Sequence, residues 1–522
     1  MRRFNVAGLC VPEEDYMVNI SGKLAQIKDL VDNRCYFTIN RARQYGKTTM
    51  LNELKKRLDD EYLCINTSFE SLDNESFSSS ESFCREFMGL VQDSLYFTSA
   101  DDEYIEKWMD EKVTTFRSLS KHITARCRGK KIVLMVDEVD KTSNNQVFLH
   151  FLSVLRSKFL GRKAGTDYTF HSVILAGVYD IKNIKLKTMK EGTYTPSDSE
   201  DKIYNSPWNI AADFDIDMSF SPSEIASMLE TYESDHHTGM CIESISEEIY
   251  SYTNGYPFLV TKICQSIDTK LNKVWTIEGV RDTAQILIGE KNTLFDDISK
   301  NLENNRELSD FIYELLILGE SKPFVIYDSI VSTGVQYGFF RRVEDKGKVV
   351  VSNKIFESLM TNYFVSRDLR RAKRITNVLQ HDVVRDGKFD MELCLCKFAE
   401  HYAEIFNKSD VEFLERHGRL LFLSYLKPLV NGQGFYHIES QLTDSRRMDI
   451  VVDFGKQQFI IELKLWRGQQ YQSEAYIQLS KYLESKHANK GYLLTFDFRK
   501  RDKIQDAKWI DIHGKKIFDV MV

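Results

Sequence analysis

The feature that most restricts the fold of this chain is a short acidic hairpin pattern near its C-terminal end. Residues 447–466 read RMDIVVDFGKQQFIIELKLW, which is two strand-like runs on either side of a Gly455-Lys456 pair. A pair that begins with glycine suits a two-residue hairpin loop. Such a loop places residues whose numbers add up to 911 opposite one another. Asp449 then faces Glu462, and the two-residue repeat of a strand puts Lys464 on the same face.

This pattern predicts a metal site. Two carboxylates directly opposite each other repel, and a bound divalent cation would remove that conflict. Because oxygen ligands suit Mg2+, we expect Asp449 and Glu462 to hold magnesium, with Lys464 beside them. The alternative is a solvated sheet face on which each carboxylate is hydrated. The second strand carries apolar residues on both faces, namely Ile460, Ile461, Leu463 and Leu465, which favours a buried strand and therefore the metal site.

Length and composition limit the class of protein. A chain of 522 residues corresponds to roughly three or four domains of about 150 residues, and 42% apolar residues are enough for packed cores. The net charge of −7 excludes a globally basic nucleic-acid-binding protein, but not a local basic groove. Nine cysteines without a C-x-x-C motif are typical of reduced thiols and a cytoplasmic location. No apolar run of about 18 residues occurs, so no membrane span is expected.

A nucleotide-binding motif occurs in the first fifty residues. An apolar run over 35–41 predicts a strand, a loop with Gly-Lys-Thr follows, and leucines at helical spacing come next. This is the context that a P-loop needs, because backbone N–H groups at the helix start cradle phosphates. Lys47 would reach the β- and γ-phosphates, and the Thr48 hydroxyl would bind Mg2+. The residues expected to line the ATP phosphates are Arg43, Gly46, Lys47, Thr48 and Thr49.

A second motif, about ninety residues further on, supports the ATP site. Residues 131–138 form a strongly apolar run that ends in Asp137 and Glu138. We expect Asp137 to coordinate magnesium and Glu138 to activate water. The alternative is that these acids merely begin the next helix, where negative charge is favourable. The order of the two motifs favours an ATP site with Mg2+.

On these motifs the chain resembles an AAA-ATPase-like family of bacterial proteins, in which a P-loop ATPase precedes a PD-(D/E)xK nuclease-type domain. The matching segments are residues 16–22, 36–50, 134–141 and 177–183. That family uses an arginine-led P-loop, so Arg41 fits it, whereas Ala42 replaces the usual proline. The resemblance implies an α/β fold in four parts. These are a P-loop ATPase core with a parallel sheet (1–220), a helical lid (221–285), a winged-helix connector (286–365) and an α/β nuclease-like domain (366–522).

The resemblance also implies three further site residues. Glu415, on a helix expected over 411–431, would face the metal, or would instead be an exposed acid paired with Arg419. Gln478 and Tyr482, on a helix expected over 473–485, would contact nucleic-acid phosphate, or would simply belong to a polar helix surface.

The expected function is an ATP-dependent or ATP-regulated, Mg2+-dependent nuclease acting on DNA. Magnesium held by Asp449 and Glu462 would stabilise charge on the phosphoryl oxygens and lower the pKa of a bound water. Lys464 would orient that water or neutralise the transition state. The alternatives are a nucleotide switch or scaffold whose nuclease-like domain binds nucleic acid without cleaving it, and an ATPase that remodels a protein partner. DNA is the expected partner, no membrane is expected, and homo-oligomer formation is left open.

Overall fold

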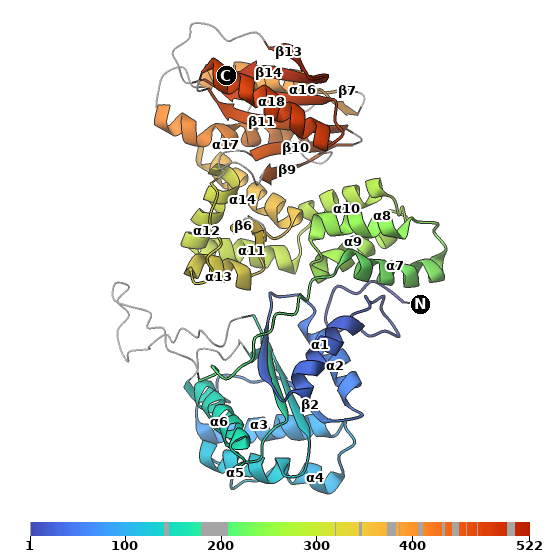
Figure 1. Ribbon diagram of the computed structural model, residues 1–522, viewed down its shortest axis with the longest axis vertical. Coiled ribbons are helices and arrows are strands. Elements are labelled where there is room, and N and C mark those ends of the chain that lie inside the picture. The colour runs from blue at the N-terminus through green and yellow to red at the C-terminus, as the bar shows by residue number, and fades with distance from the viewer. Residues whose placement is uncertain are drawn as a thin grey trace. The chain divides into compact units, whose positions relative to one another are not determined.

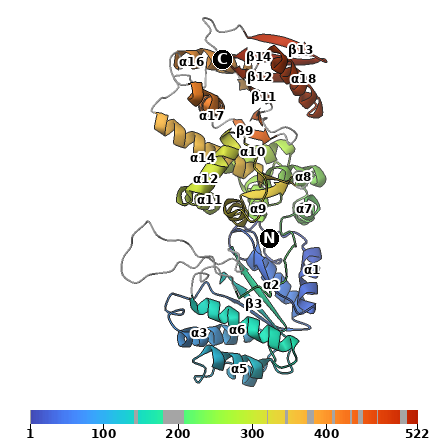
Figure 2. The same cartoon turned by 60° about the vertical axis from the view of Figure 1, so that its left-hand side comes forward.

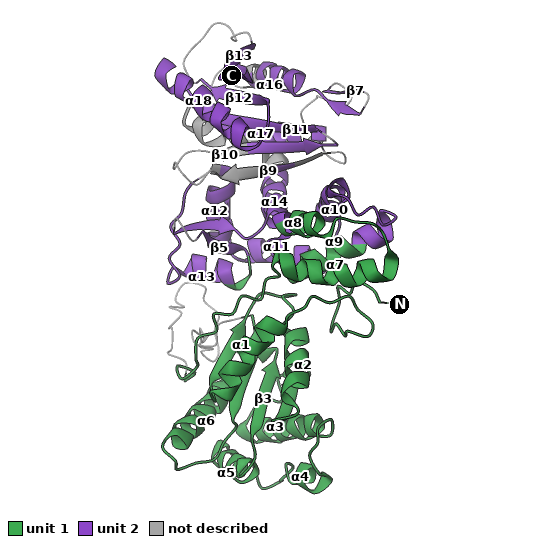
Figure 3. Ribbon diagram, turned by 45° about the vertical axis from the view of Figure 1, so that its right-hand side comes forward, with its two compact units in different colours: residues 1–250, 255–265, 336–338 green, residues 251–254, 266–335, 339–522 purple. Residues whose placement is uncertain are grey.

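The computed structural model divides the chain into two compact units, which are described separately below (Figure 3). Unit 1 comprises residues 1–250, 255–265 and 336–338, and unit 2 comprises residues 251–254, 266–335 and 339–522. The structure describes residues 2–139, 146–178, 207–318, 320–343, 347–372, 383–385, 387–405, 411–430, 434–440, 448–455, 457–466, 468–497 and 507–522. No helix within these ranges is long and apolar enough to cross a membrane.

Unit 1 is built on a four-stranded parallel sheet in the order β1-β4-β3-β2. Its strands are β1 (Tyr36–Asn40), β2 (Leu63–Ser68), β3 (Ile132–Asp137) and β4 (Ser172–Gly177). Every residue of β3 and β4 is buried. This explains their nearly continuous apolar sequences, because a parallel sheet is covered on both faces. The parallel α/β core expected from the sequence is confirmed.

Helices cover both faces of this sheet (Figures 1 and 2). On one face, α1 (Ser21–Asp32) and α2 (Lys47–Leu58) pack on the apolar residues of β1 and β4. The other face is covered by three longer helices and one short one. They are α3 (Ser80–Leu95), α4 (Asp102–Glu106), α5 (Phe116–Cys127) and α6 (Gln146–Lys163). The two cores hold the carboxyl ends of the strands rigidly, and the candidate nucleotide site lies there.

The middle of the chain is mainly helical. Four helices occupy most of the segment expected to form a lid: α7 (Pro222–His236), α8 (Ile242–Thr253), α9 (Pro257–Lys270) and α10 (Ile277–Gly289). After them come α11 (Thr293–Asn304), α12 (Arg306–Tyr313), the π-helical turn η3 (Glu314–Leu318) and α13 (Ser329–Gln336). The antiparallel hairpin of β5 (Phe340–Val343) and β6 (Lys348–Val351) precedes α14 (Lys354–Ala372). The winged-helix connector predicted over 286–365 and the four domain boundaries stay predictions.

The C-terminal part of unit 2 contains a mixed six-stranded sheet in the order β13-β14-β12-β11-β10-β9. The two helices and the hairpin expected from the sequence correspond to α17 (Val411–Val430), α18 (Gln469–Ser485) and β10 (Met448–Phe454) with β11 (Gln457–Leu465). Two further strands of this sheet are β9 (Gly434–Ser440) and β12 (Lys490–Phe496). Three further parts were not predicted from the sequence: α16 (Met391–Ile405), the small ribbon of β7 (Val384–Arg385) and β8 (Lys388–Phe389), and the hairpin of β13 (Lys508–Ile512) and β14 (Lys515–Met521).

Helices also cover both faces of this second sheet. α18 packs on Ile460, Leu493 and Ile517 of three neighbouring strands. On the other face, the ring of Phe496 lies against Phe398 of α16 and against the backbone of α17 at Gly418. Alternating side chains along β11 and β12 therefore separate an α18 face, which bears Glu462, from an α16–α17 face.

Candidate nucleotide and nuclease-type sites

The P-loop turns between β1 and α2 on a left-handed glycine. Gly46 has φ 76° and ψ 17° and is followed directly by α2, a conformation that a side chain would disfavour. Lys47 is buried, and its Nζ donates hydrogen bonds of 3.0 Å to the carbonyl oxygens of Arg41 and Ala42. The loop thus holds an ammonium group among oxygen acceptors, as a buried cation requires. Nucleotide phosphate oxygens could take over that role.

A hydroxyl and a carboxylate meet beside this lysine. Thr48 Oγ1 donates a 2.6 Å hydrogen bond to Asp137 Oδ2, and Asp137 Oδ1 accepts one of 2.9 Å from the Glu138 backbone N–H. Glu138 has φ 54°, a conformation that costs a non-glycine residue energy and is frequent at functional sites. Asp137 is the last residue of β3, and the positive φ of Glu138 is not that of an α-helix, so neither acid is itself part of a helical turn. The oxygen pair of Thr48 and Asp137 fits the magnesium of a bound Mg2+–ATP.

Arg41 occupies the position of the usual first glycine and braces the loop. Its guanidinium donates to the carbonyl oxygens of Asn40 (2.9 Å) and Ile216 (2.7 Å) and lies 5.5 Å from the centre of the Phe214 ring. Burial lowers the pKa of Arg41. Arg43 is exposed on the same loop, and its role in phosphate binding stays a prediction.

Two tyrosines, which the sequence analysis did not single out, attach the P-loop to its surroundings. Tyr256 OH donates a 2.5 Å hydrogen bond to the Arg43 carbonyl, and its ring meets that of Tyr45 edge to face. The Tyr45 hydroxyl lies 2.8 Å from Ser219 Oγ. Tyr256 lies in a Gly-Tyr-Pro segment and directly precedes α9, which falls within the range predicted to form the lid. The loop conformation is thereby linked to that helix.

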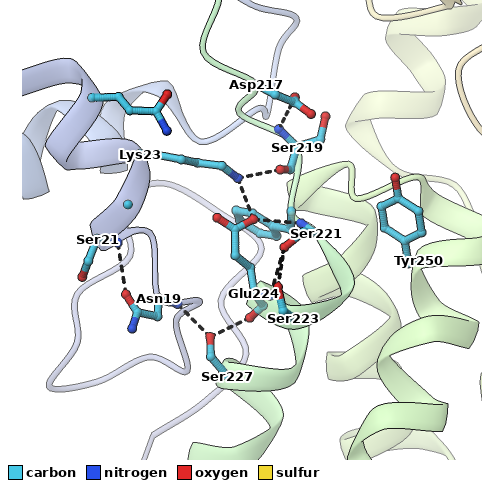
Figure 4. A pocket seen from close by; sticks show the side chains of 13 residues that line it. Asn19, Ser21, Lys23, Asp217, Ser219, Ser221, Ser223, Glu224, Ser227 and Tyr250 are labelled. Carbon is cyan, nitrogen blue, oxygen red and sulfur yellow. Dashed lines mark hydrogen bonds and ion pairs between the residues drawn. The ribbon is translucent and has the colours of Figure 1, made fainter. Parts of the chain in front are cut away.

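Ser219 also lines a polar cavity of about 610 Å3 between the start of α1 and the start of α7 (Figure 4). Lys23 Nζ lies 2.6 Å from the Ser219 carbonyl and 2.6 Å from Glu224 Oε2. Glu224 also accepts a hydrogen bond from the Ser221 backbone N–H, closing the N-terminal cap of α7. Lys23, on α1, therefore contacts the N-terminal cap of α7.

The candidate nuclease-type site lies on β10 and β11, and its backbone register is the one expected. Asp449 is paired with Glu462, and Phe454 is paired with Gln457, which leaves a two-residue loop. Gly455 in that loop has φ 54°. The side chain of Asp449 lies outside the described part of the structure. Residues paired across a sheet share a face, so the register brings the two acidic positions together.

Glu462 and Lys464 form a partly buried ion pair. Glu462 is 3% exposed, and Lys464 Nζ lies 3.0 Å from its Oε1. A carboxylate withdrawn from water needs a compensating charge, which Lys464 supplies and which a cation bound between Asp449 and Glu462 would also supply. Among the side chains that the structure describes, no group of three or more His, Cys, Asp or Glu could hold a metal. Since the acidic oxygens at this position suit Mg2+, these residues fit a magnesium ion.

Three predicted site residues, Glu415, Gln478 and Tyr482, belong to the helices α17 and α18. The side chain of Glu415 lies outside the described residues, and its helix α17 packs on the Phe496 face of the sheet, opposite to the face of Glu462. Tyr482 is largely buried with Leu479 and Leu483 in the α18 core, whereas Gln478 is half-buried. Their roles in metal and nucleic-acid binding stay predictions.

The fold and the two sites define the class: a P-loop ATPase core followed by a nuclease-type α/β domain. A family model described as "AAA-like domain" matches residues 16–358, and one described as "PD-(D/E)XK nuclease superfamily" matches residues 435–507. The chain therefore belongs to the AAA-like domain family and carries a PD-(D/E)XK nuclease superfamily domain at its C-terminal end.

Known proteins give more distant similarities. The uncharacterized WD repeat-containing protein slr0143 of Synechocystis sp. is 23% identical over 378 residues, which are 66% of this chain and 29% of that protein. The chain thus spans about three tenths of the length of that relative. Among solved structures, the Walker-type ATPase PABY2304 of Pyrococcus abyssi has a TM-score of 0.47 at 11% identity, covering 68% of this chain and 99% of its own. The RuvB Holliday junction branch migration motor of Thermotoga maritima has a TM-score of 0.33 at 12% identity, covering 69% and 95%.

Proposed function

We propose that this protein is an ATP-regulated, metal-dependent nuclease that acts on DNA. The observation that carries the proposal is the register that pairs Asp449 with Glu462, with the Lys464 ammonium 3.0 Å from Glu462. This arrangement supplies two acidic positions and one cation on the same sheet face, as phosphodiester hydrolysis with a bound metal needs.

The residues of the nuclease-type site would divide the work as follows. Asp449 and Glu462 would hold Mg2+, and the bound ion would supply charge stabilisation at the phosphoryl oxygens and a more acidic water. Lys464 turns from its ion pair with Glu462 toward the phosphate and stabilises the negative charge that develops there. The buried position of Glu462 limits competing water and strengthens these electrostatic interactions.

The P-loop would supply the regulation. Lys47 exchanges the Arg41 and Ala42 carbonyls for nucleotide phosphates, Thr48 and Asp137 hold the magnesium of Mg2+–ATP, and Glu138 activates the attacking water. Tyr256 is hydrogen-bonded to the Arg43 carbonyl. A change in the conformation of the P-loop on nucleotide binding or hydrolysis would therefore move the start of α9. That helix is part of the predicted lid.

One observation favours a second candidate, a nucleotide switch whose nuclease-like domain binds nucleic acid without cleaving it. The ion pair of Lys464 with Glu462 compensates the buried carboxylate without a metal. A site of this kind could contact phosphate through Lys464 alone.

An assay of Mg2+-dependent nicking of a supercoiled plasmid, with and without ATP, distinguishes the nuclease from the nucleotide switch. The unchanged protein should nick, and Asp449→Asn should abolish nicking. Asp453→Asn is the matched control on the same strand and face, where Asp453 accepts a hydrogen bond from Gln458, and it should cleave normally. Cleavage that persists in Asp449→Asn would reject the metal assignment, and binding without any nicking by the unchanged protein would favour the switch.

A further inference from the structure

A buried polar network connects α18 to the sheet beside the candidate nuclease-type site. Gln472, in the first turn of α18, donates from Nε2 to Thr495 Oγ1 on β12 (3.2 Å) and to Asp519 Oδ1 on β14 (3.0 Å). Tyr476, one turn further along α18, donates from its hydroxyl to Asp519 Oδ2 (2.8 Å). Gln472, Thr495 and Asp519 are all buried. Four side chains from three elements thus form one connected group.

The four side chains of the network form hydrogen bonds with one another. The Thr495 hydroxyl also lies 3.3 Å from Gln472 Oε1, and both carboxylate oxygens of Asp519 accept hydrogen bonds. Burial raises the pKa of Asp519. Taking such groups out of water is unfavourable, and apolar side chains could pack a helix on a sheet as well. What a fully satisfied network adds is a unique, rigid placement of the parts it joins.

The network includes Thr495 of β12, which lies next to Lys464. β11 and β12 are parallel neighbours, and their register pairs Lys464 with Thr495 and Glu462 with Leu493. In turn, Leu493 is paired with Asp519 of β14. Paired residues share a sheet face, so Thr495 lies directly beside Lys464. The chain also leads from Lys464 into α18 within five residues, so the network holds Lys464 from its neighbouring strand and from the helix that follows it.

We propose that Gln472 is a positioning residue for Lys464, acting through Thr495 and the first turn of α18. The inference rests on the proposed nuclease function and adds a residue to that same site. The hydrogen bonds that the Gln472 side chain makes in the described part of the structure go to Thr495, Asp519 and Tyr476, so its effect on Lys464 is indirect. A misplacement of about 1 Å at a reacting group can lower a rate by about two orders of magnitude. Loss of the hydrogen bonds of this network should therefore lower the cleavage rate, because Lys464 is then held less precisely.

The test uses the full chain and the plasmid-nicking assay. Gln472→Met keeps the length and volume of the side chain but removes its hydrogen bonds, and we expect at least a tenfold slower rate at saturating Mg2+. The Mg2+ concentration for half-maximal rate should stay the same, because Asp449 and Glu462 are unchanged. Gln470→Met is the matched control. Gln470 is exposed on the same helix and donates a hydrogen bond to Glu474 of that helix, so the cleavage rate of this variant should be that of the unchanged protein.

A double-mutant cycle separates positioning from general structural damage. If Gln472 acts through Lys464, Gln472→Met should change the residual rate of a Lys464→Arg variant by less than about threefold, since coupled residues are not additive. Tyr476→Phe removes the hydroxyl that donates to Asp519 and accepts from Gln472 but leaves the hydrogen bonds of Gln472 to Thr495 and Asp519 in place. It is the milder second variant, and it should lower the rate in the same direction without loss of folding.

The outcomes are distinguishable. Normal cleavage by Gln472→Met, or an equal loss in the Lys464→Arg background, would overturn the inference while leaving the nuclease proposal in place. Absence of cleavage by the unchanged protein would overturn the proposed function, and the inference with it.

Discussion

The hydroxyl of Thr48 donates a 2.6 Å hydrogen bond to the carboxylate of Asp137, although 89 residues separate them in the chain. The helix that follows the P-loop and the carboxyl end of β3 therefore meet at one point. If this point holds the magnesium of Mg2+–ATP, Thr48→Ala should lower the ATP hydrolysis rate by roughly 100-fold, the range found when one group that stabilises transition-state charge is removed. Thr231→Ala, which removes a hydroxyl bonded within α7, should leave hydrolysis unchanged. Equal rates for the two variants would contradict the ATP site.

The ion pair of Glu462 and Lys464 leads to a prediction on stability and metal binding. Lys464→Met leaves the buried Glu462 carboxylate without its cation and should destabilise the β10–β11 region by about 2 kcal/mol, less than the value for a fully buried pair because Lys464 is partly exposed. Mg2+ should restore much of this loss. Hydrogen exchange of peptides covering residues 448–465, with and without Mg2+, measures both effects. Equal protection in the two conditions would argue against a metal at Glu462.

Gly255 allows the chain to approach the segment before α7. It has φ 72°, and a Cβ built there would lie 2.1 Å from the Phe220 carbonyl oxygen. Gly255→Ala should therefore destabilise the protein by at least about 1–3 kcal/mol, from backbone strain and overlap. Gly89→Ala, inside α3 where nothing lies within 4 Å of an added Cβ, should instead stabilise it by about 0.5–1 kcal/mol. Denaturant unfolding measures both, and a stable Gly255→Ala would contradict the close approach.

His171 makes unit 1 sensitive to acid. Burial and the neighbouring cations Arg34, Arg162 and Lys131 lower its pKa to about 4. Below about pH 6.5 the unfolded chain binds a proton at His171, whereas the folded protein keeps this imidazole neutral until the pH approaches 4. The contribution of His171 to the free energy of unfolding is therefore complete above about pH 6.5 and is lost as the pH falls toward 4.

A His171→Gln variant should lose less thermal stability than the unchanged protein between about pH 7.5 and pH 5. The control is His150→Gln, at an exposed position of α6, which should behave like the unchanged protein. Parallel losses in all three proteins would show that another group causes the acid sensitivity.

Local patterns in the sequence were enough to predict several parts of the structure. The Gly455-Lys456 pair sets the register of Asp449 and Glu462, because a two-residue loop leaves one pairing for the strands that flank it. The turn at Gly46 and the buried strand that ends at Asp137 also depend on neighbouring residues alone.

Other features could not be predicted in this way. The sequence predicts that Tyr482 contacts nucleic-acid phosphate or belongs to a polar helix surface. The structure buries Tyr482 in the α18 core, because which side of α18 packs on the sheet depends on the position of β12 and β14, and its contact with nucleic acid stays a prediction. The hairpin of β13 and β14 was missed, although it supplies Asp519. No local pattern shows that a strand from the end of the chain returns beside β12.

The sequence by itself determined the elements, the hairpin register and the P-loop, since each follows from turn chemistry and side-chain periodicity over a few residues. Only the tertiary structure decided that Thr48 meets Asp137, that Tyr256 holds the carbonyl of Arg43, 213 residues away in the chain, and that Gln472 meets Asp519, 47 residues away. The physical reason is that such contacts form only when distant segments are brought together by burial of the apolar faces between them.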